Sequence, residues 1–331
     1  MESVSKVKVF GVGGAGCRLA GKIAETDFGG VGCYAVDDDY SALKISKCEN
    51  KIQIKGGSRA GADFGCCRET ALENSGLFKD AVKGADLVVI TAGLGGGMGS
   101  AAAPVIANIA KDEGILTVAV VCTPLRFEGA KRLVNSAKGL ASLRNAADTV
   151  IVISGDKIAD IIPNGAPPSA GLEIADEAVI NAIRTVVIPA AVPSIINLDF
   201  SDLKTVVENA GRVHFGYGYA SGENRARAAA EAAVYDPTSD VSLAQTDRMI
   251  LMVEGGDLQY DEVEKVINFV RDAADYSAKI IFSVVTDSGL NNGIGVFILA
   301  ARRRDADEEE AEEPDENPLS TELLQILNAS V

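Results

Sequence analysis

The sequence contains no tryptophan, one histidine and few aromatic residues, which make up 5% of its 331 residues. One histidine and six cysteines without metal-site spacing make a zinc site unexpected. No run reaches the roughly 18 apolar residues of a membrane-spanning helix. The first residues, MESVSKVKVF, show no signal-peptide pattern. These absences predict a cytoplasmic protein with free thiols.

Positive charge is also scarce, and the net charge is −16. Residues 1–304 carry −6, whereas the stretch DADEEEAEEPDE at 305–316 carries nine acids and no base. Neither part offers the basic face that nucleic acid requires, so no nucleic-acid partner is expected. Residues 305–318 are predicted to form a disordered, self-repelling linker. Anionic lipid would repel this linker, so no direct membrane insertion is expected.

The last residues, 319–331, space their leucines and isoleucine roughly along one helical face. A short apolar helix after a charged linker is suited to docking into a partner's groove. The alternative is a chance apolar terminus, because so short a helix is marginal on its own.

Strand-like and helix-like runs alternate through the first 155 residues. The strand-like runs are continuously apolar, as at 87–92, which is typical of strands buried on both faces of a parallel sheet. The fold class is therefore α/β: a doubly wound, mainly parallel, Rossmann-like sheet over residues 1–170. A long connecting helix over 171–196 leads to a smaller α+β domain over 197–304.

Two glycine-rich turns each follow a strand and precede a helix. The first, GVGGAG at 11–16, fits G-x-G-x-x-G, and Asp37 closes the next strand about 20 residues on. Glycine lets the backbone approach a phosphate, and a helix N-terminus offers unpaired N–H groups. Taken alone, this turn equally supports an NAD(P) enzyme, or a tight turn without a ligand.

The second turn, GLGGGMGS at 93–100, is another glycine-rich connection from a strand to a helix. A dinucleotide fold needs one pyrophosphate cradle, whereas two such turns on one sheet suggest a polyphosphate held from both sides. Gly95, Gly96, Gly97 and Gly99 would present backbone N–H groups, and Ser100 would add a hydroxyl. No G-x-x-x-x-G-K-[ST] sequence is present, so the chain is not a P-loop protein.

The segments GVGGAGC, AVDDD, GLGGGMGSAAAP, PLRFEGAKR and NLDFSDLKTV occur in the order found in the tubulin/FtsZ superfamily. Over about residues 7–301 the chain resembles this superfamily, and within it the FtsZ-type cell-division GTPases. The resemblance implies a GTPase that binds GTP or GDP with Mg²⁺ and assembles with itself into head-to-tail filaments. It also implies that residues 319–331 bind a membrane adaptor or another division protein.

The resemblance also assigns roles to residues. The two glycine turns hold the α- and β-phosphates, 59–63 senses the γ-phosphate, Glu128 and Arg132 contact ribose and phosphates, and Asp39 lies near the phosphates and Mg²⁺. The nucleotide-binding residues implied in this way, or standing at base-contacting positions, are Gly13, Gly14, Ala15, Gly16, Arg18, Asp39, Ala60, Gly61, Ala62, Gly95, Gly96, Gly97, Met98, Gly99, Ser100, Glu128, Arg132, Asp176 and Glu177.

Catalysis is implied at Asn197, Asp199 and Asp202, which match the family's loop that enters the nucleotide pocket of the next subunit. In that family the two carboxylates of this loop polarise the water that attacks the γ-phosphate. Two carboxylates three residues apart at a helix start can point the same way, as this role requires. From the residues alone, an N-cap followed by a first-turn acid explains the same pair.

Several departures from the family pattern fall on the pocket. Arg18 replaces the usual Asn that contacts guanine, Leu172 replaces a frequent aromatic, and Met98 replaces a Thr between the glycines. The usual base-reading Asp aligns with Glu177, beside Asp176. A carboxylate there could accept two N–H bonds from guanine, or Arg18 could pair with Glu177 and alter the base pocket. The alternative function is therefore a divergent nucleotide-binding filament protein with weak or no hydrolysis and a regulatory or cell-shape role.

Overall fold

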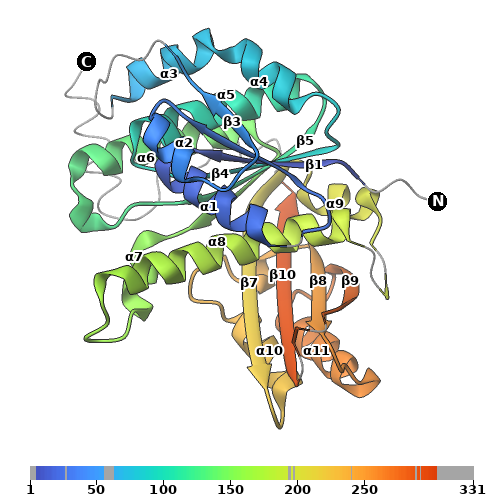
Figure 1. Ribbon diagram of the computed structural model, residues 1–331. Coiled ribbons are helices and arrows are strands. Elements are labelled where there is room, and N and C mark those ends of the chain that lie inside the picture. The colour runs from blue at the N-terminus through green and yellow to red at the C-terminus, as the bar shows by residue number, and fades with distance from the viewer. Residues whose placement is uncertain are drawn as a thin grey trace.

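The computed structural model describes residues 5–26, 28–55, 63–192, 195–196, 198–239, 241–287, 289–290 and 292–303. The N-terminal domain is built on a six-stranded sheet in which every neighbouring pair is parallel (Figure 1). Its strands are β1 (Val7–Val12), β2 (Gly32–Asp37), β3 (Asn50–Gln53), β4 (Leu87–Gly93), β5 (Leu116–Cys122) and β6 (Thr149–Ile153). Their order across the sheet is β3-β2-β1-β4-β5-β6.

Helices cover both faces of this sheet, because alternate residues of each buried strand point to opposite sides. Val7 and Val9 pack with α1 and α8 on one face, and Phe10 and Val12 pack with α3 to α6 on the other. The helices of this domain are α1 (Gly13–Glu25), α2 (Tyr40–Ile45), α3 (Phe64–Glu73), α4 (Ser75–Val82), α5 (Gly97–Asp112), η1 (Arg126–Glu128), α6 (Ala130–Ala146) and α7 (Gly155–Ile161).

A long helix, α8 (Pro168–Ala191), runs between the two domains (Figure 1). Beyond it, a mixed sheet has the order β7-β10-β8-β9. This second domain comprises α9 (Phe200–Val207), β7 (Ala210–Ser221), α10 (Arg225–Val234), η2 (Leu243–Gln245), β8 (Arg248–Gly255), α11 (Tyr260–Ala273), β9 (Lys279–Thr286) and β10 (Gly293–Arg303). The predicted fold class, a parallel α/β domain joined by a long helix to a smaller α+β domain, is confirmed.

An ion pair between the partly buried Arg184 and the buried Glu254 joins α8 to the second sheet. Arg184 donates from Nη2 to Oε1 of Glu254 at 2.6 Å, and its guanidinium lies 5.4 Å from the centre of the Phe297 ring. Burial raises the pKa of the Glu254 carboxyl to about 7 although Arg184 opposes that shift. This contact anchors the connecting helix on the sheet that follows it.

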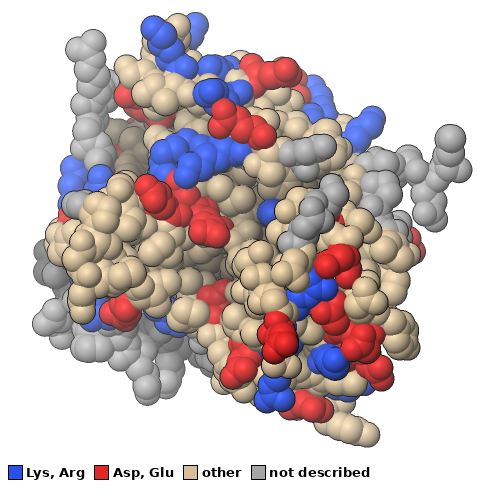
Figure 2. All heavy atoms as spheres, turned by 60° about the horizontal axis from the view of Figure 1, so that its bottom comes forward, with Lys and Arg blue, Asp and Glu red and all other residues tan. Residues whose placement is uncertain are grey.

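Charged side chains of both signs lie interspersed on the face shown in Figure 2. The exposed ion pairs of the protein include Lys265 with Asp261, at 2.7 Å. Among the described residues no helix is both long and apolar enough to cross a bilayer. The linker predicted at 305–318 and the docking segment at 319–331 lie outside the described residues.

Candidate nucleotide site

The two glycine turns meet at the carboxyl edge of the parallel sheet. Strand β1 lies between β2 and β4, so the connections from β1 and β4 leave toward opposite faces and open a crevice between them. A cleft of about 930 Å³ occupies this position. Its lining comes from α1 and the start of α5, from residues at or just after the ends of β2, β3, β4 and β5, from η1 and α6, and from α3 and α8.

Direct packing between the two turns explains part of their glycine content. Gly13 has φ +74°, and a Cβ on it would lie 2.9 Å from the amide N of Gly99. A Cβ on Gly99 would lie 2.7 Å from the carbonyl O of Gly93. At Gly14 and Gly96, by contrast, a Cβ would meet no atom within 4 Å, and both residues line the cleft. The backbone is therefore close-packed behind the turns and open in front of them.

Two helix N-termini converge on this cleft without side-chain caps. Neither α1 nor α5 receives a side-chain hydrogen bond at its N-cap, and neither has an acid in its first turn. The first N–H groups of a helix need external acceptors, and the helix dipole adds partial positive charge there. Two such ends facing one cavity form an anion site suited to a chain of phosphates.

Ser100 does not take the position expected of a phosphate ligand. Its side chain is fully buried, and its Oγ accepts a hydrogen bond from the N–H of Gly95 at 2.8 Å. Asn135 of α6, which the sequence did not single out, donates to the carbonyl O of Gly95 at 3.2 Å. Neither Gly95 nor Ser100 lines the cleft, so these residues shape the turn from behind.

Gly16 also lies behind the cleft. A Cβ on it would lie 2.6 Å from the carbonyl O of Thr91 and 2.8 Å from the carbonyl carbon of Gly11. This glycine lets α1 pack directly on β1 and β4.

We expect Gly16→Ala and Gly14→Ala to act on different properties. Backbone atoms surround Gly16, so its alanine variant should lower the free energy of unfolding by about 1–3 kcal/mol through overpacking. Gly14→Ala should leave that free energy unchanged or slightly raised, and should weaken nucleotide binding because its methyl group enters the cleft. Urea unfolding and nucleotide titration of both variants measure the two effects. Equal loss of stability would contradict the assignment.

Met98 lines the cleft but is only 7% exposed, and it packs in the core cluster that contains Phe10 and Val12. Its bulk is therefore directed mainly into the core. Glu128 and Arg132 both line the cleft, and Arg132 donates from Nη1 to Oε2 of Glu128 at 2.6 Å. The two residues come from different elements, Glu128 from η1 and Arg132 from the first turn of α6, rather than from one helical face as their spacing of four suggests.

Acidic side chains lie at the end of β2. Asp38 and Asp39 line the cleft, and Asp39 also caps α2 by accepting the N–H of Ser41 at 2.8 Å. Asp37, which a dinucleotide enzyme would use for ribose, is only 4% exposed and accepts the N–H groups of Asp38 and Asp39. Burial raises the pKa of the Asp37 carboxyl to about 7. Its position supports the loop rather than a ligand.

The end of the cleft where base-contacting residues are expected differs from the predicted pairing of Arg18 with Glu177. Asp176, not Glu177, lines the cleft, and Glu177 is exposed outside it. Arg18 donates from Nη1 to Oδ2 of Asp176, and Lys22 donates to the same oxygen at 2.7 Å. Leu172 lines the cleft one turn earlier on α8 and is 60% exposed.

Three cysteines also line the cleft, a feature that their spacing did not indicate: Cys66, Cys67 and Cys122. All six cysteines are free. Burial raises the pKa of the Cys67 and Cys122 thiols to about 11. Near neutral pH both therefore remain protonated and weakly nucleophilic.

Asp199 and Asp202 lie far from this cleft. Asp199 is the N-cap of α9 and is exposed, and its N–H donates to Oδ2 of Asp202 at 3.2 Å. Thr149, the first residue of β6, bonds through its hydroxyl to the carbonyl O of Val207 in α9. Helix α9 therefore packs at the amino edge of the sheet, about 20 Å, or one strand length, from the carboxyl edge (Figure 1).

Four predicted site residues lie outside the described part of the chain: Ala60, Gly61, Ala62 and Asn197. Within the described part, no group of three or more His, Cys, Asp or Glu side chains forms a metal cluster.

A doubly wound sheet with two uncapped helix ends at its switch point defines a nucleotide-binding α/β protein. Comparison with known proteins is more specific. Residues 6–163 match the Tubulin/FtsZ family GTPase domain, and residues 211–302 match the FtsZ family C-terminal domain. The chain belongs to the tubulin/FtsZ family.

Solved structures agree with this assignment. An empty FtsZ dimer from M. jannaschii is 34% identical, with 91% of this chain and 89% of that chain covered and a TM-score of 0.85. A GDP-bound CetZ1 monomer from Haloferax volcanii is 21% identical, covering 98% of this chain and 100% of that one, with a TM-score of 0.78. A GTPγS-bound CetZ2 protofilament from the same organism is 20% identical, covering 98% and 99%, with a TM-score of 0.75. The two CetZ proteins share the fold.

Proposed function

We propose that this protein binds GTP and GDP in the cleft, assembles head to tail into filaments and hydrolyses GTP where two subunits meet. One observation carries the proposal: the phosphate-binding turns and the candidate catalytic acids lie at opposite edges of the same sheet. A site divided in this way is incomplete within one chain and becomes complete when the acidic end of one subunit covers the cleft of another.

Within the cleft, the N–H groups of α1 and α5 and the backbone of Gly14 and Gly96 would hold the phosphates. Arg132 supplies a cation near them. Mg²⁺ typically uses one or two carboxylates together with phosphate oxygens and waters, so Asp38 and Asp39 suit it without a larger cluster. When bound, the ion would neutralise charge on the terminal phosphates.

The opposite end of the molecule suits a heterologous contact. Ile195 and Ile196, just before α9, are 71% and 40% exposed. Ile196 forms an antiparallel β-bridge with Val284 of β9. At the cleft end, Phe127 is 82% exposed. Different exposed apolar side chains at the two ends suit head-to-tail association, which generates open filaments when the rotation does not close a ring.

At the completed site, Asp199 and Asp202 would act as carboxylates that orient and polarise the attacking water. In the isolated chain, Asp202 instead accepts the N–H of Asp199. That capping contact positions the pair at the N-terminus of α9, so the capping and catalytic interpretations are compatible.

A second candidate, an assembly protein with weak or no hydrolysis, is favoured by the altered pocket. Arg18 occupies the base end through its pair with Asp176, and Met98 removes a hydroxyl from the phosphate turn. The cellular role that we propose is cell division, with cell shape as the alternative. A membrane adaptor or division protein would bind residues 319–331.

Phosphate release from GTP, with ATP in parallel and Mg²⁺ present, tests the proposal across a protein dilution series. If the site forms only between subunits, release per subunit should be negligible at low concentration and rise above a threshold concentration. A rate per subunit that does not change with dilution would contradict intersubunit hydrolysis. Filaments that form with GTP but release no phosphate would support the second candidate.

A further inference from the structure

The carboxylate at the base end of the cleft is already partly occupied. Asp176 is only 3% exposed, and its Oδ2 accepts hydrogen bonds from both Arg18 and Lys22 of α1. Within the described residues, its other oxygen, Oδ1, has no hydrogen-bond partner. A carboxylate that reads both the N1–H and the 2-amino group of guanine needs two available oxygens. In this protein only Oδ1 of Asp176 remains available to accept a hydrogen bond from a base.

Arg18 presents hydrogen-bond donors to the same end of the cleft at which Asp176 presents an acceptor. It lines the cleft, its side chain is 40% exposed, and only Nη1 is engaged by Asp176. Among the described residues its remaining N–H groups have no acceptor. A guanidinium fork pairs well with the O6 and N7 acceptors of guanine. Adenine presents an amino group in place of O6, so the same donors disfavour it.

We infer that this cleft selects 6-oxopurine nucleotides through Arg18. The 2-amino group, which distinguishes guanine from hypoxanthine, contributes little to the affinity of the nucleotide. The inference rests on the proposed nucleotide site and names the substrate class of that site. Asp176 Oδ1 accepts N1–H, which guanine and hypoxanthine share. The Arg18 donors contact O6 and N7, which the two bases also share, so GDP and IDP become near-equivalent ligands.

Calorimetric titration of the nucleotide-free full chain with GDP, IDP and ADP tests this without requiring hydrolysis. We expect the Kd values of GDP and IDP to agree within about threefold. ADP should bind about a hundredfold more weakly, because its amino group leaves the Arg18 donors unpaired.

Two variants separate the roles. Arg18→Asn leaves Asp176 paired with Lys22, so the buried carboxylate keeps a cation and the chain should fold. Without Arg18, one hydrogen-bond donor fewer competes for the Asp176 carboxylate, so this carboxylate should accept a hydrogen bond from the 2-amino group more readily. The affinity for GDP should then rise about tenfold relative to the affinity for IDP, which corresponds to one hydrogen bond to a charged group. Arg18→Lys keeps the charge but loses the fork, so discrimination against ADP should fall. Thermal unfolding monitored by circular dichroism verifies that both variants fold.

The outcomes are distinct. A preference of tenfold or more for GDP over IDP in the unaltered protein overturns this inference and leaves the proposed GTP site standing. ADP binding as tightly as GDP overturns the role of Arg18. Binding of none of the three nucleotides contradicts the proposed function itself.

Discussion

Asp199→Asn is expected to lower GTP hydrolysis per subunit by about 10²–10⁴-fold, the usual contribution of a positioned acid–base group. Asparagine is as good an N-cap as aspartate, so α9 should keep its structure, and GDP affinity should stay unchanged because the cleft lies at the other edge of the sheet. Phosphate release and GDP titration measure the two properties. Glu208→Gln, which removes an exposed acid at the other end of α9, is the matched control and should retain full activity.

Mixing two inactive variants tests whether the acid and the cleft belong to different subunits. Gly14→Asp would place a carboxylate among the phosphate-binding N–H groups and prevent nucleotide binding, yet it keeps Asp199. In mixed filaments, clefts of Asp199→Asn subunits that contact Gly14→Asp subunits regain the acid. Activity should therefore reappear on mixing. No recovery, when sedimentation shows that both variants share filaments, would contradict intersubunit catalysis.

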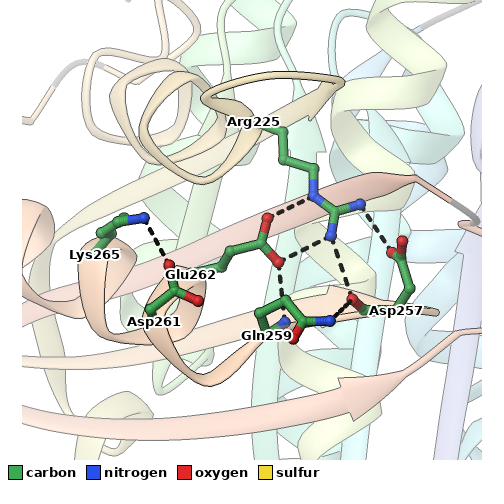
Figure 3. A network of polar contacts seen from close by, with 6 residues as sticks. All are labelled: Arg225, Asp257, Gln259, Asp261, Glu262 and Lys265. Carbon is green, nitrogen blue, oxygen red and sulfur yellow. Dashed lines mark hydrogen bonds and ion pairs between the residues drawn. The ribbon is translucent and has the colours of Figure 1, made fainter.

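Glu262→Ala is expected to destabilise the second domain by about 3 kcal/mol, because it removes a partner from a buried cation. Figure 3 shows Arg225 of α10 between Glu262 of α11 and Asp257. The Arg225 side chain is 7% exposed and binds Glu262 through two N–H···O contacts of 2.7 and 2.9 Å, with a third of 2.8 Å to Asp257. The pair fastens the start of α10 to the start of α11.

Urea unfolding of this variant should be compared with that of Asp261→Ala, which breaks the exposed pair with Lys265 one residue away. That control should change stability little, because exposed ion pairs are weak. The Arg225 contact holds the pKa of Glu262 below its usual range, so its stabilisation is present above the ordinary Glu pKa and is lost as pH falls through the lowered one. If the two variants lose equal stability, or if the loss caused by Glu262→Ala does not depend on pH, the stabilising role of the Arg225–Glu262 pair is contradicted.

Local pattern was sufficient for most of the architecture. Continuous apolar runs predicted the buried parallel strands, and the glycine turns at 11–16 and 93–100 predicted where the cleft lies, because loops after parallel strands share one edge of the sheet. The edge strand β3, NKIQ, was not predicted, since its exposed polar residues carry no strand signal. The stretch 72–84 reads as one helix in the sequence, but the structure divides it, because α3 ends at Glu73 and α4 begins at Ser75.

The sequence by itself determined most of the strand and helix pattern, the two glycine turns and the acid pair at the start of α9, because each depends on neighbours a few residues apart. The tertiary structure decided the rest. It turned Ser100 inward to hold Gly95 and brought Arg18 to Asp176, 158 positions along the chain. It also separated Asp199 from the cleft by the length of a strand. Such contacts depend on how helices dock across a sheet. The spacing of residues along the sequence does not predict that docking.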